Sequence, residues 1–373
     1  MSRPTEHVDR PFLAIIFLLV LIGFFIFSSA SLGLLGREGA QFSSVAFSQI
    51  VFGIGGGLIA LTILANVPYR TYRNLAPYLY GVSIFLLALV FIPGIGYVAN
   101  GARRWLNVFG HSFQPAEIVK ITFILFLAWY FSTYYKKLND VRFALGGLFA
   151  GLAIAGVFLL LQPDTGTFAI LAITGGAMAL AANVRLKHIA ILVALLVMGL
   201  GVLALSRPYL LDRVLTFMHP ASDPSGSGYQ IRQSLIAVGS GGLFGRGFGQ
   251  SVQKFSYLPE PIGDSIFSVA AEEFGFVGSL CIIGLFLLFA IRGLQIATHA
   301  PDRFGGLTVV GIVILIVAQT NMNIGSMVGI MPLTGEPLVF ISHGGTSLFF
   351  ALASVGIILN ISRYSLKTQP ASI

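Results

Sequence analysis

Apolar residues gather along this chain into long runs separated by short polar connections. Ten such runs have roughly 16 to 26 residues, close to the length that spans a hydrocarbon core at about 1.5 Å per helical residue. They cover about Phe12 to Ala30, Val45 to Ala65, Pro77 to Ile92, Ala116 to Phe131, Phe143 to Leu161, Gly166 to Ala182, Ile189 to Leu205, Ile266 to Ile291, Gly306 to Val328 and Thr346 to Ile361. The pattern predicts an all-α, polytopic membrane protein with about ten transmembrane helices and both termini on one side.

One connection is much longer than the rest and runs from about Ser206 to Ser265. It is rich in glycine between Gly239 and Gly249, and it ends in the stiff sequence Tyr257-Leu258-Pro259-Glu260-Pro261 just before Asp264. Long connections without regular structure are usually functional. We therefore expect the chemistry in this loop, within a single transmembrane domain of residues 1–373.

Composition and charge agree with this class and orient it. The chain is 56% hydrophobic and 10% charged, with a formal net charge of +8. The positive-inside rule identifies one face as cytoplasmic, together with both termini. The cations of that face are Arg3, Arg10, Arg70, Arg73, Lys136, Lys137, Arg142, Arg185, Lys187, Arg292, Arg303, Arg363 and Lys367. The long loop is then extracytoplasmic, and orientation explains the basic balance without nucleic acid.

Ionisable residues inside the predicted spans are expensive and tend to mark a function or a polar cavity. Glu117 and Lys120 lie three residues apart, so they share a helix face and can form an ion pair that simply tolerates burial. Glu272 and Glu273 point about 100° apart on a helix, so at least one must face protein or water. A structural hydrogen bond explains them as well as catalysis does. The single cysteine, Cys281, excludes an intramolecular disulfide.

Several polar groups on the outer face could take part in one site. Arg103 and Arg104 suit bidentate recognition of phosphate oxygens, or they anchor the protein at lipid headgroups. Asp164 follows Gln162-Pro163 and is expected to cap the next helix. Arg246 and Lys254 support the interpretation of the glycine-rich segment as an anion-binding nest, although a hinge explains the glycines equally well.

Asp264 stands immediately before the eighth predicted span. A short acidic side chain at that position is a natural N-cap, because its oxygen can accept a hydrogen bond from the first turn. Sequence position alone therefore leaves capping and catalysis open.

In order along the chain, a series of motifs resembles the SEDS family of shape, elongation, division and sporulation proteins over nearly the whole length. The motifs are Asn100-Gly101-Ala102-Arg103-Arg104-Trp105, Gln114-Pro115-x-Glu117-x-x-Lys120, Gln162-Pro163-Asp164-x-Gly166-Thr167, Gly228-Tyr229-Gln230, Gly239-Ser240-Gly241-Gly242-Leu243-x-Gly245, Tyr257-Leu258-Pro259-Glu260, Asp264-x-Ile266-Phe267, Glu272-Glu273-x-Gly275 and Thr334-Gly335-x-Pro337-x-x-Phe340-Ile341-Ser342-x-Gly344-Gly345. The chain departs from the family pattern at Ile262-Gly263, where His-Thr is usual, and at His343, where Tyr is usual.

The resemblance implies a peptidoglycan glycosyltransferase of the bacterial cytoplasmic membrane that polymerises lipid II on the outer face. Its implied partner is a class B penicillin-binding protein, a transpeptidase, alongside other divisome or elongasome membrane proteins. Gly228-Tyr229-Gln230 and the segment Gly247 to Lys254 are more similar to the division member FtsW than to the elongation member RodA.

Sugar transfer from a pyrophosphate-linked donor needs a base, and we expect Asp264 to supply it. Arg103, Arg104, Lys120, Arg246 and Lys254 are the candidates to bind the substrate's phosphates. A hydrated Mg²⁺ or Mn²⁺ would serve the same end, and hard oxygen ligands are available in Asp264, Glu117 and Asp164. No nucleotide or organic cofactor is expected. The alternatives are a lipid II flippase, or a non-catalytic scaffold that activates a partner synthase.

Overall fold

The computed structural model describes residues 8–36, 42–99, 102–108, 111–206, 208–219, 223 and 226–364. The predicted Asn100-Gly101, several of the predicted outer and cytoplasmic charges, and both termini lie outside these ranges. The helices of the first half are α1 (Arg10–Ser31), η1 (Leu32–Gly36), α2 (Phe42–Phe47), the π-helix η2 (Ser48–Gly56), α3 (Gly57–Asn66), α4 (Tyr69–Leu89), α5 (Pro115–Thr133), η3 (Tyr135–Lys137), α6 (Val141–Leu161) and α7 (Thr165–Ala181).

The second half continues this helical arrangement. Its helices are α8 (Leu186–Ser206), α9 (Pro208–Met218), α10 (Ser227–Ser240), α11 (Gln253–Ser256), α12 (Ile266–Thr298), α13 (Arg303–Met327) and α14 (Gly345–Arg363). Helices occupy all ten predicted apolar runs, and among the described residues seven helical segments are long and apolar enough to cross a membrane. The prediction of a polytopic helical membrane protein is confirmed.

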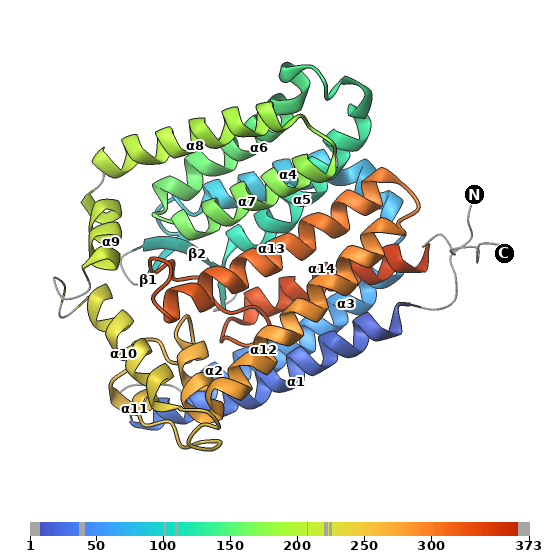
Figure 1. Ribbon diagram of the computed structural model, residues 1–373. Coiled ribbons are helices and arrows are strands. Elements are labelled where there is room, and N and C mark those ends of the chain that lie inside the picture. The colour runs from blue at the N-terminus through green and yellow to red at the C-terminus, as the bar shows by residue number, and fades with distance from the viewer. Residues whose placement is uncertain are drawn as a thin grey trace.

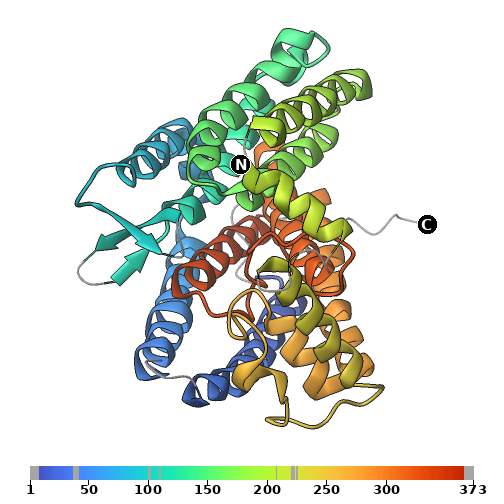
Figure 2. The ribbon, with the colours of Figure 1, turned by 90° about the vertical axis from the view of Figure 1, so that its left-hand side faces the viewer.

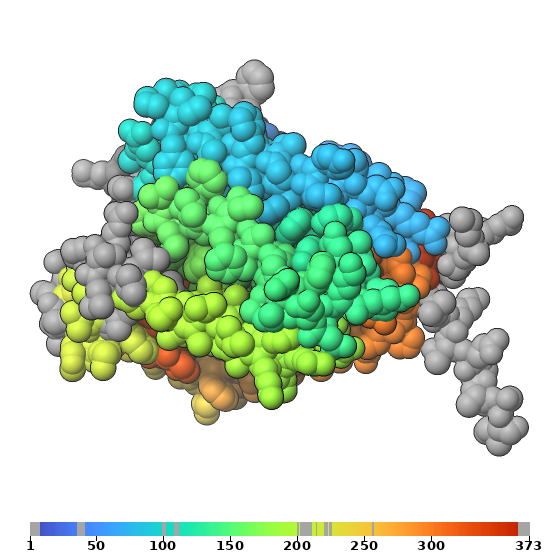
Figure 3. Space-filling view, turned by 90° about the horizontal axis from the view of Figure 1, so that it is seen from above, coloured from blue at the N-terminus to red at the C-terminus, as the bar shows by residue number. Residues whose placement is uncertain are grey.

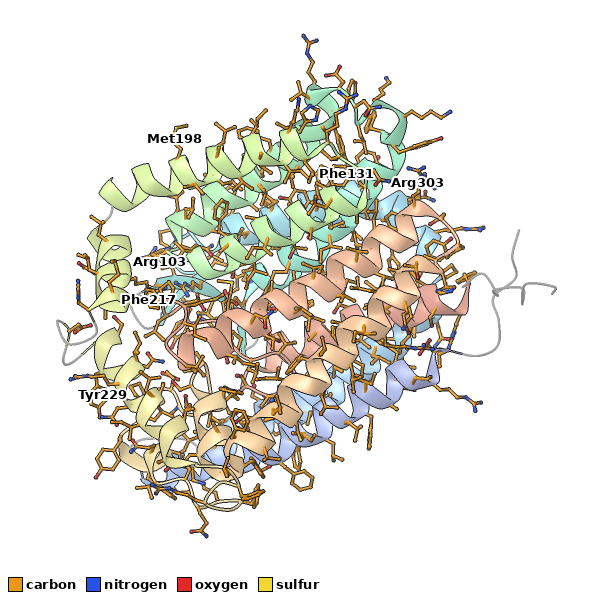
Figure 4. All side chains as sticks on the ribbon, in the orientation of Figure 1. Arg103, Phe131, Met198, Phe217, Tyr229 and Arg303 are labelled. Carbon is orange, nitrogen blue, oxygen red and sulfur yellow. The ribbon has the colours of Figure 1, made fainter. Side chains whose placement is uncertain are left out.

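The long helices lie roughly side by side, and α1 begins at the same end of the bundle where α14 ends (Figure 1). Arg303, assigned to the cytoplasmic face, and Arg103, assigned to the outer face, lie at opposite ends (Figure 4). We call the end that carries Arg103 the outer end. This arrangement agrees with the predicted division of charges.

The helices differ in how deeply they are buried. α13 packs against α5, α7, α12 and α14, and most of its residues are buried. By contrast, the most apolar windows of α12 and of the segment Phe42–Asn66 are only 22% and 17% buried, as expected where a helix faces lipid. From above, the surface is formed mainly by the middle of the chain, coloured blue to yellow-green (Figure 3). Polar groups carried by α13 are therefore held in the most enclosed part of the molecule.

The outer end contains regular structure that the apolar pattern did not predict. A three-stranded antiparallel sheet joins β1 (Gly96–Ala99), β2 (Ala102–Val108) and β3 (His111–Phe113). The sheet lies beside the outer helices when the molecule is seen from that end (Figure 2). The prediction of a structureless connection from Ser206 to Ser265 is wrong, because α9, α10 and α11 lie within it.

Candidate active site at the outer end

Asp264 lies in a tight turn between the glycine-rich segment and α12. The backbone N–H groups of Gly263 and Ser265 both donate to the carbonyl of Glu260, at 3.0 and 3.3 Å. The N-cap of α12 is Ser265 and no side chain caps this helix, which excludes capping, one of the two roles that sequence position leaves open for Asp264. The Asp264 Oδ1 atom is buried without a hydrogen-bond partner.

The surroundings of Asp264 favour its protonated form. Burial raises the pKa of Asp264 to about 6, and the negative charge of Glu260 acts in the same direction. A hydrogen bond from the Gln230 side chain, on α10, opposes the rise. A carboxylate whose pKa lies closer to neutrality is a stronger base than an ordinary aspartate while still ionised at pH 7.

A second turn, from Leu338 to Gly344, supports the chain around Asp264. The Ser342 hydroxyl donates to the carbonyl of Gly263 at 2.7 Å, and the N–H of His343 donates to the carbonyl of Ile262 at 2.7 Å. Two positions at which the chain departs from the family pattern, Ile262 and His343, therefore meet here. Their contact is between backbone atoms, so it does not depend on which side chains they carry.

Gln49, in the π-helix η2, holds this second turn from the opposite side. Its Nε2 donates to the carbonyl of Ser342 at 3.2 Å, and its Oε1 accepts from the N–H of Gly344 at 3.1 Å. The neighbouring residue of the π-helix, Ser48, lies beside Gly345, where a Cβ atom would meet the Ser48 hydroxyl at 2.8 Å. Nothing in the sequence analysis singled out Gln49, because a polar residue in an apolar run gives no sign of its partner.

A buried cluster of charges lies under the outer end, between α5, α7 and the loop after α13. The Lys120 ammonium lies 2.9 Å from Glu117 and 3.7 Å from Glu336, and it donates to Gln319 Oε1 at 3.0 Å. The predicted pairing of Glu117 with Lys120 is confirmed. The position of Glu336 beside Lys120 depends on the packing of α5 against α13, so the sequence gives no sign of it.

Asp164 belongs to the same cluster. Its Oδ1 accepts from the N–H of Thr167 at 3.3 Å and caps α7, which confirms the predicted capping role. The Thr167 hydroxyl bridges the two acids, lying 3.0 Å from Asp164 and 2.9 Å from Glu336. With Glu117 the cluster holds three carboxylates around one ammonium. Burial accordingly raises the pKa of Glu336, while Lys120 opposes the rise.

The two arginines of β2 differ in their surroundings. Arg104 donates to the carbonyls of Gln162 and Pro163 and so ties the sheet to the turn before α7. Arg103 is exposed at the outer end, where Figure 4 also places Phe217 of α9 and Tyr229 of α10. Arg103 is thus available to a ligand, whereas Arg104 is largely used within the protein.

The glycine-rich segment is bound to a break in α12. Gly275 has a φ of 69°, and the N–H groups that follow it donate to the segment: Phe276 to the carbonyl of Gly242 at 2.9 Å and Val277 to that of Leu243 at 3.1 Å. In return, the N–H groups of Arg246 and Gly247 donate to the carbonyls of Glu272 and Glu273 at 3.0 Å each. The predicted anion-binding nest is therefore wrong for these two N–H groups, which already have acceptors.

Side chains complete this contact. The Lys254 ammonium is fully buried and lies 2.7 Å from Glu273 Oε1, with Ser29 Oγ and the carbonyl of Gly249 each at 2.9 Å. Arg246 pairs with Glu272 at 3.5 Å, but its side chain is 42% exposed. Both glutamates thus face protein, as predicted for at least one of them. Lys254 is committed to this internal cluster, and only Arg246 remains accessible to a ligand.

The predicted divalent cation was assigned to Asp264, Glu117 and Asp164. Among the residues that the structure describes, no group of three or more His, Cys, Asp or Glu side chains is arranged to hold a metal ion. Glu117 is paired with Lys120, and Asp164 caps α7. These residues do not fit a metal site of their own, and a cation carried by the pyrophosphate of a substrate stays a prediction.

Comparison with known proteins identifies the family of this chain. Residues 9–367 match the model of the FtsW, RodA and SpoVE family, described as cell cycle protein. Stage V sporulation protein E of Bacillus subtilis is 42% identical over 98% of this chain and 100% of its own length. The protein named "Probable peptidoglycan glycosyltransferase FtsW" of a Geobacter species is 37% identical over 82% of this chain and 83% of its own length.

Two solved structures share the fold at lower identity. A chain from a structure of a peptidoglycan synthase complex, described as coordinating polymerization and crosslinking, superposes with a TM-score of 0.80 and is 27% identical over 97% of this chain and 100% of that chain. The rod shape determining protein RodA of Thermus thermophilus gives a TM-score of 0.70 at 27% identity, over 97% of this chain and 99% of that chain. Identity is thus higher to the SpoVE and FtsW relatives than to this RodA.

Proposed function

This chain belongs to the FtsW, RodA and SpoVE family and is a peptidoglycan glycosyltransferase, and from that premise we propose that it polymerises lipid II on the outer side of the bacterial cytoplasmic membrane with Asp264 as general base. The observation that carries the proposal is the state of Asp264: a carboxylate at the outer end, with one oxygen lacking a partner and a pKa of about 6.

The reaction balances with one base. The 4-hydroxyl oxygen of the acceptor sugar attacks the anomeric carbon of the donor, and Asp264 takes the hydroxyl proton. The bond between the anomeric carbon and the pyrophosphate oxygen breaks, and the lipid pyrophosphate leaves with that electron pair. Attack from the opposite face inverts the anomeric configuration. A positioned base of this kind contributes about 10²- to 10⁴-fold in rate.

The leaving pyrophosphate needs cations near its developing charge. Of the five predicted candidates, Arg103 and Arg246 keep exposed side chains, and we propose that these two meet the phosphates. Lys120 shares its charge with Glu117 and Glu336, and Lys254 with Glu273, so neither offers an uncompensated positive charge. Arg104 positions the sheet through backbone carbonyls.

The solved peptidoglycan synthase complex, one chain of which shares this fold, supports a partner for this protein. We propose that the chain works with a class B penicillin-binding protein, which crosslinks the glycan as it is made, and that further divisome or elongasome proteins join them. Both termini are proposed to be cytoplasmic, in agreement with Arg103 and Arg303 lying at opposite ends. The greater similarity to FtsW and SpoVE than to RodA favours a role in division or sporulation septa.

Polymerisation of fluorescent lipid II tests the proposal. The purified chain is assayed alone and with its cognate penicillin-binding protein, whose transpeptidase is blocked, and the product is resolved as a glycan ladder. Asp264→Asn keeps the shape of the side chain but cannot accept a proton. We expect it to lose the ladder by a factor of about 10² or more.

Asp302→Asn is the matched control. Asp302 caps α13 by accepting from the N–H of Gly305 at 2.8 Å, and asparagine caps helices about equally well. This variant should polymerise like the wild type. A ladder that persists in Asp264→Asn would refute the base, and a wild-type protein that makes no ladder under any partner or cation condition would favour lipid II transport or a scaffold.

A further inference from the structure

Two buried asparagines in this bundle hold backbone carbonyls, but they differ in what their amide oxygens do. Asn360, on α14, donates to the carbonyl of Ala65 at 2.8 Å, and its Oδ1 accepts from the N–H of Tyr69 at 2.9 Å. Asn323, on α13, uses its Nδ2 twice and leaves its Oδ1 without a partner. Buried polar atoms are rarely left unpaired in a purely structural role.

The two hydrogen bonds of Asn323 join two segments of the active site. Its Nδ2 donates to the carbonyl of Asp264 at 2.7 Å and to the carbonyl of Glu336 at 2.8 Å. The reverse orientation of the amide would place Oδ1 against two carbonyl oxygens, so chemistry fixes which way the side chain points. Asn323 is entirely buried, so water does not compete for these bonds.

One turn earlier on the same face of α13, Gln319 continues this attachment. Its Nε2 donates to the carbonyl of Pro337 at 3.0 Å, and its Oε1 accepts from Lys120 at 3.0 Å. The segment Glu336–Pro337 is therefore fixed to α13 at two points. Of the two amides, Asn323 is the one that also reaches the main chain of Asp264.

We propose that Asn323 is a positioning residue that sets the place and the basicity of the Asp264 carboxylate by fixing its main chain to α13 and to the Glu336 segment. The inference rests on the proposed function of Asp264 as base. Because a displacement of about 1 Å can cost on the order of 10²-fold in rate, one hydrogen bond to the carbonyl of Asp264 and one to that of Glu336 are enough to matter.

The charged groups around Asp264 determine what a substitution does. Glu260 lies in the same turn as Asp264 and raises the pKa of Asp264. The carbonyl of Glu336 accepts the second hydrogen bond of Asn323, and the Glu336 carboxylate lies 3.7 Å from the Lys120 ammonium. His343 packs beside Ile262, and burial lowers the pKa of its imidazole, which therefore adds no positive charge at neutral pH. An aspartate at position 323 would lose both hydrogen bonds, because its oxygens would face the carbonyls of Asp264 and Glu336, and when ionised it would add a negative charge beside Asp264.

The experiment compares Asn323→Asp with Asn360→Asp in the lipid II assay, with the blocked partner present and rates normalised to folded protein. We expect Asn323→Asp to lower kcat about 10- to 100-fold with KM within about twofold. The acid limb of its pH–rate profile should move to higher pH, because the new negative charge raises the pKa of Asp264. Asn360→Asp should lower thermal stability and leave the acid limb in place.

A second pair of variants keeps the test decisive if the aspartates fail to fold. Asn323→Ala removes both hydrogen bonds without adding charge, so Asp264 becomes more solvated and the acid limb should move to lower pH, opposite to Asn323→Asp. Asn360→Ala should not move it. An unmoved acid limb in a folded Asn323 variant, while Asp264→Asn is inactive, overturns this inference alone. Activity in Asp264→Asn overturns the proposed function instead.

Discussion

The carboxylates of Glu272 and Glu273, in α12, and that of Asp264, just before α12, differ in how fully their oxygens are paired. Glu273 contacts Lys254 and accepts from Ser29 at 2.6 and 2.7 Å, and Glu272 accepts from the Ser251 hydroxyl at 2.6 Å. Asp264, eight residues before Glu272, has a buried Oδ1 without a hydrogen-bond partner. Acidic side chains within one short stretch of chain thus differ in whether all of their oxygens have hydrogen-bond partners.

The difference separates a structural role from a chemical one. Paired carboxylates hold the glycine-rich segment against the break at Gly275, where the helix alone could not satisfy its own backbone. A partly buried carboxylate with one unpaired oxygen costs stability and gains basicity, as expected at active sites. Lys254 and Asp264, both predicted from sequence as site residues, fall on different sides of this division.

The largest effect should come from breaking the paired group. Lys254→Met removes the ammonium and leaves Glu273 without its counter-charge, because both side chains are no more than 1% exposed. We expect destabilisation of about 3–5 kcal/mol, measured as a fall in the thermal unfolding midpoint of the detergent-solubilised protein. Glycan synthesis should fall only in proportion to the loss of folded protein.

Arg246→Met is the matched control for that substitution. Arg246 pairs with the adjacent Glu272, but its side chain is 42% exposed, and the buried Glu272 keeps hydrogen bonds from the Ser251 hydroxyl and the N–H groups of Val252 and Gln253, so removal of Arg246 should cost less than about 1 kcal/mol. Equal destabilisation by the two variants would mean that burial does not distinguish the two ion pairs. A Lys254→Met protein that is stable but no longer binds phosphate would mean that Lys254 contacts the substrate.

A smaller effect should appear in the pH dependence of the unpaired group. Asp264 must be ionised to accept a proton, and its pKa is raised to about 6, so activity should be full above that pH and fall as the pH drops through it. Below about pH 6 the rate should decrease about tenfold per pH unit. The pH profile of kcat/KM for lipid II polymerisation checks this, and an acid limb near pH 4, the ordinary aspartate value, would contradict it.

The smallest effect is on stability. The folded protein holds the pKa of Asp264 above its ordinary value of 3.8, so ionisation of this group destabilises the fold progressively as the pH rises from about 4 to about 6. Asp264→Asn should therefore raise the unfolding midpoint by a few degrees at neutral pH. The gain should shrink as the pH falls towards 4. Asp302→Asn, which changes a carboxylate that caps α13, should show no such pH-dependent gain.

Local pattern was sufficient for much of the fold. The apolar runs predicted all ten long helical segments, since about twenty apolar residues can satisfy their backbone in lipid only as a helix. Two local contacts were also readable from spacing. Glu117 and Lys120 pair at i,i+3, and Asp164 caps the helix that starts at the next residue.

Predictions failed where the partner of a residue is far away in sequence. The glycines of the connection 206–265 predict a loop without regular structure, whereas α12 supplies the hydrogen-bond partners that order its glycine-rich part. Sequence position leaves capping of α12 open for Asp264, but Ser265 takes the N-cap position and no side chain caps the helix. Gln49 and Asn323 had no sequence signal, because their acceptors lie in other segments.

By itself, the sequence determined the membrane class, the number and places of the long helices, and the set of charged residues available for chemistry. It could do so because hydrophobic length and i,i+3 spacing are local properties. Only the tertiary structure decided which charges are neutralised and which are left for a substrate: Lys254 meets Glu273 and Ser29, whereas Asp264 meets no donor at Oδ1. Hydrogen bonding and desolvation depend on neighbours brought together by packing, and those neighbours set the basicity of a carboxylate.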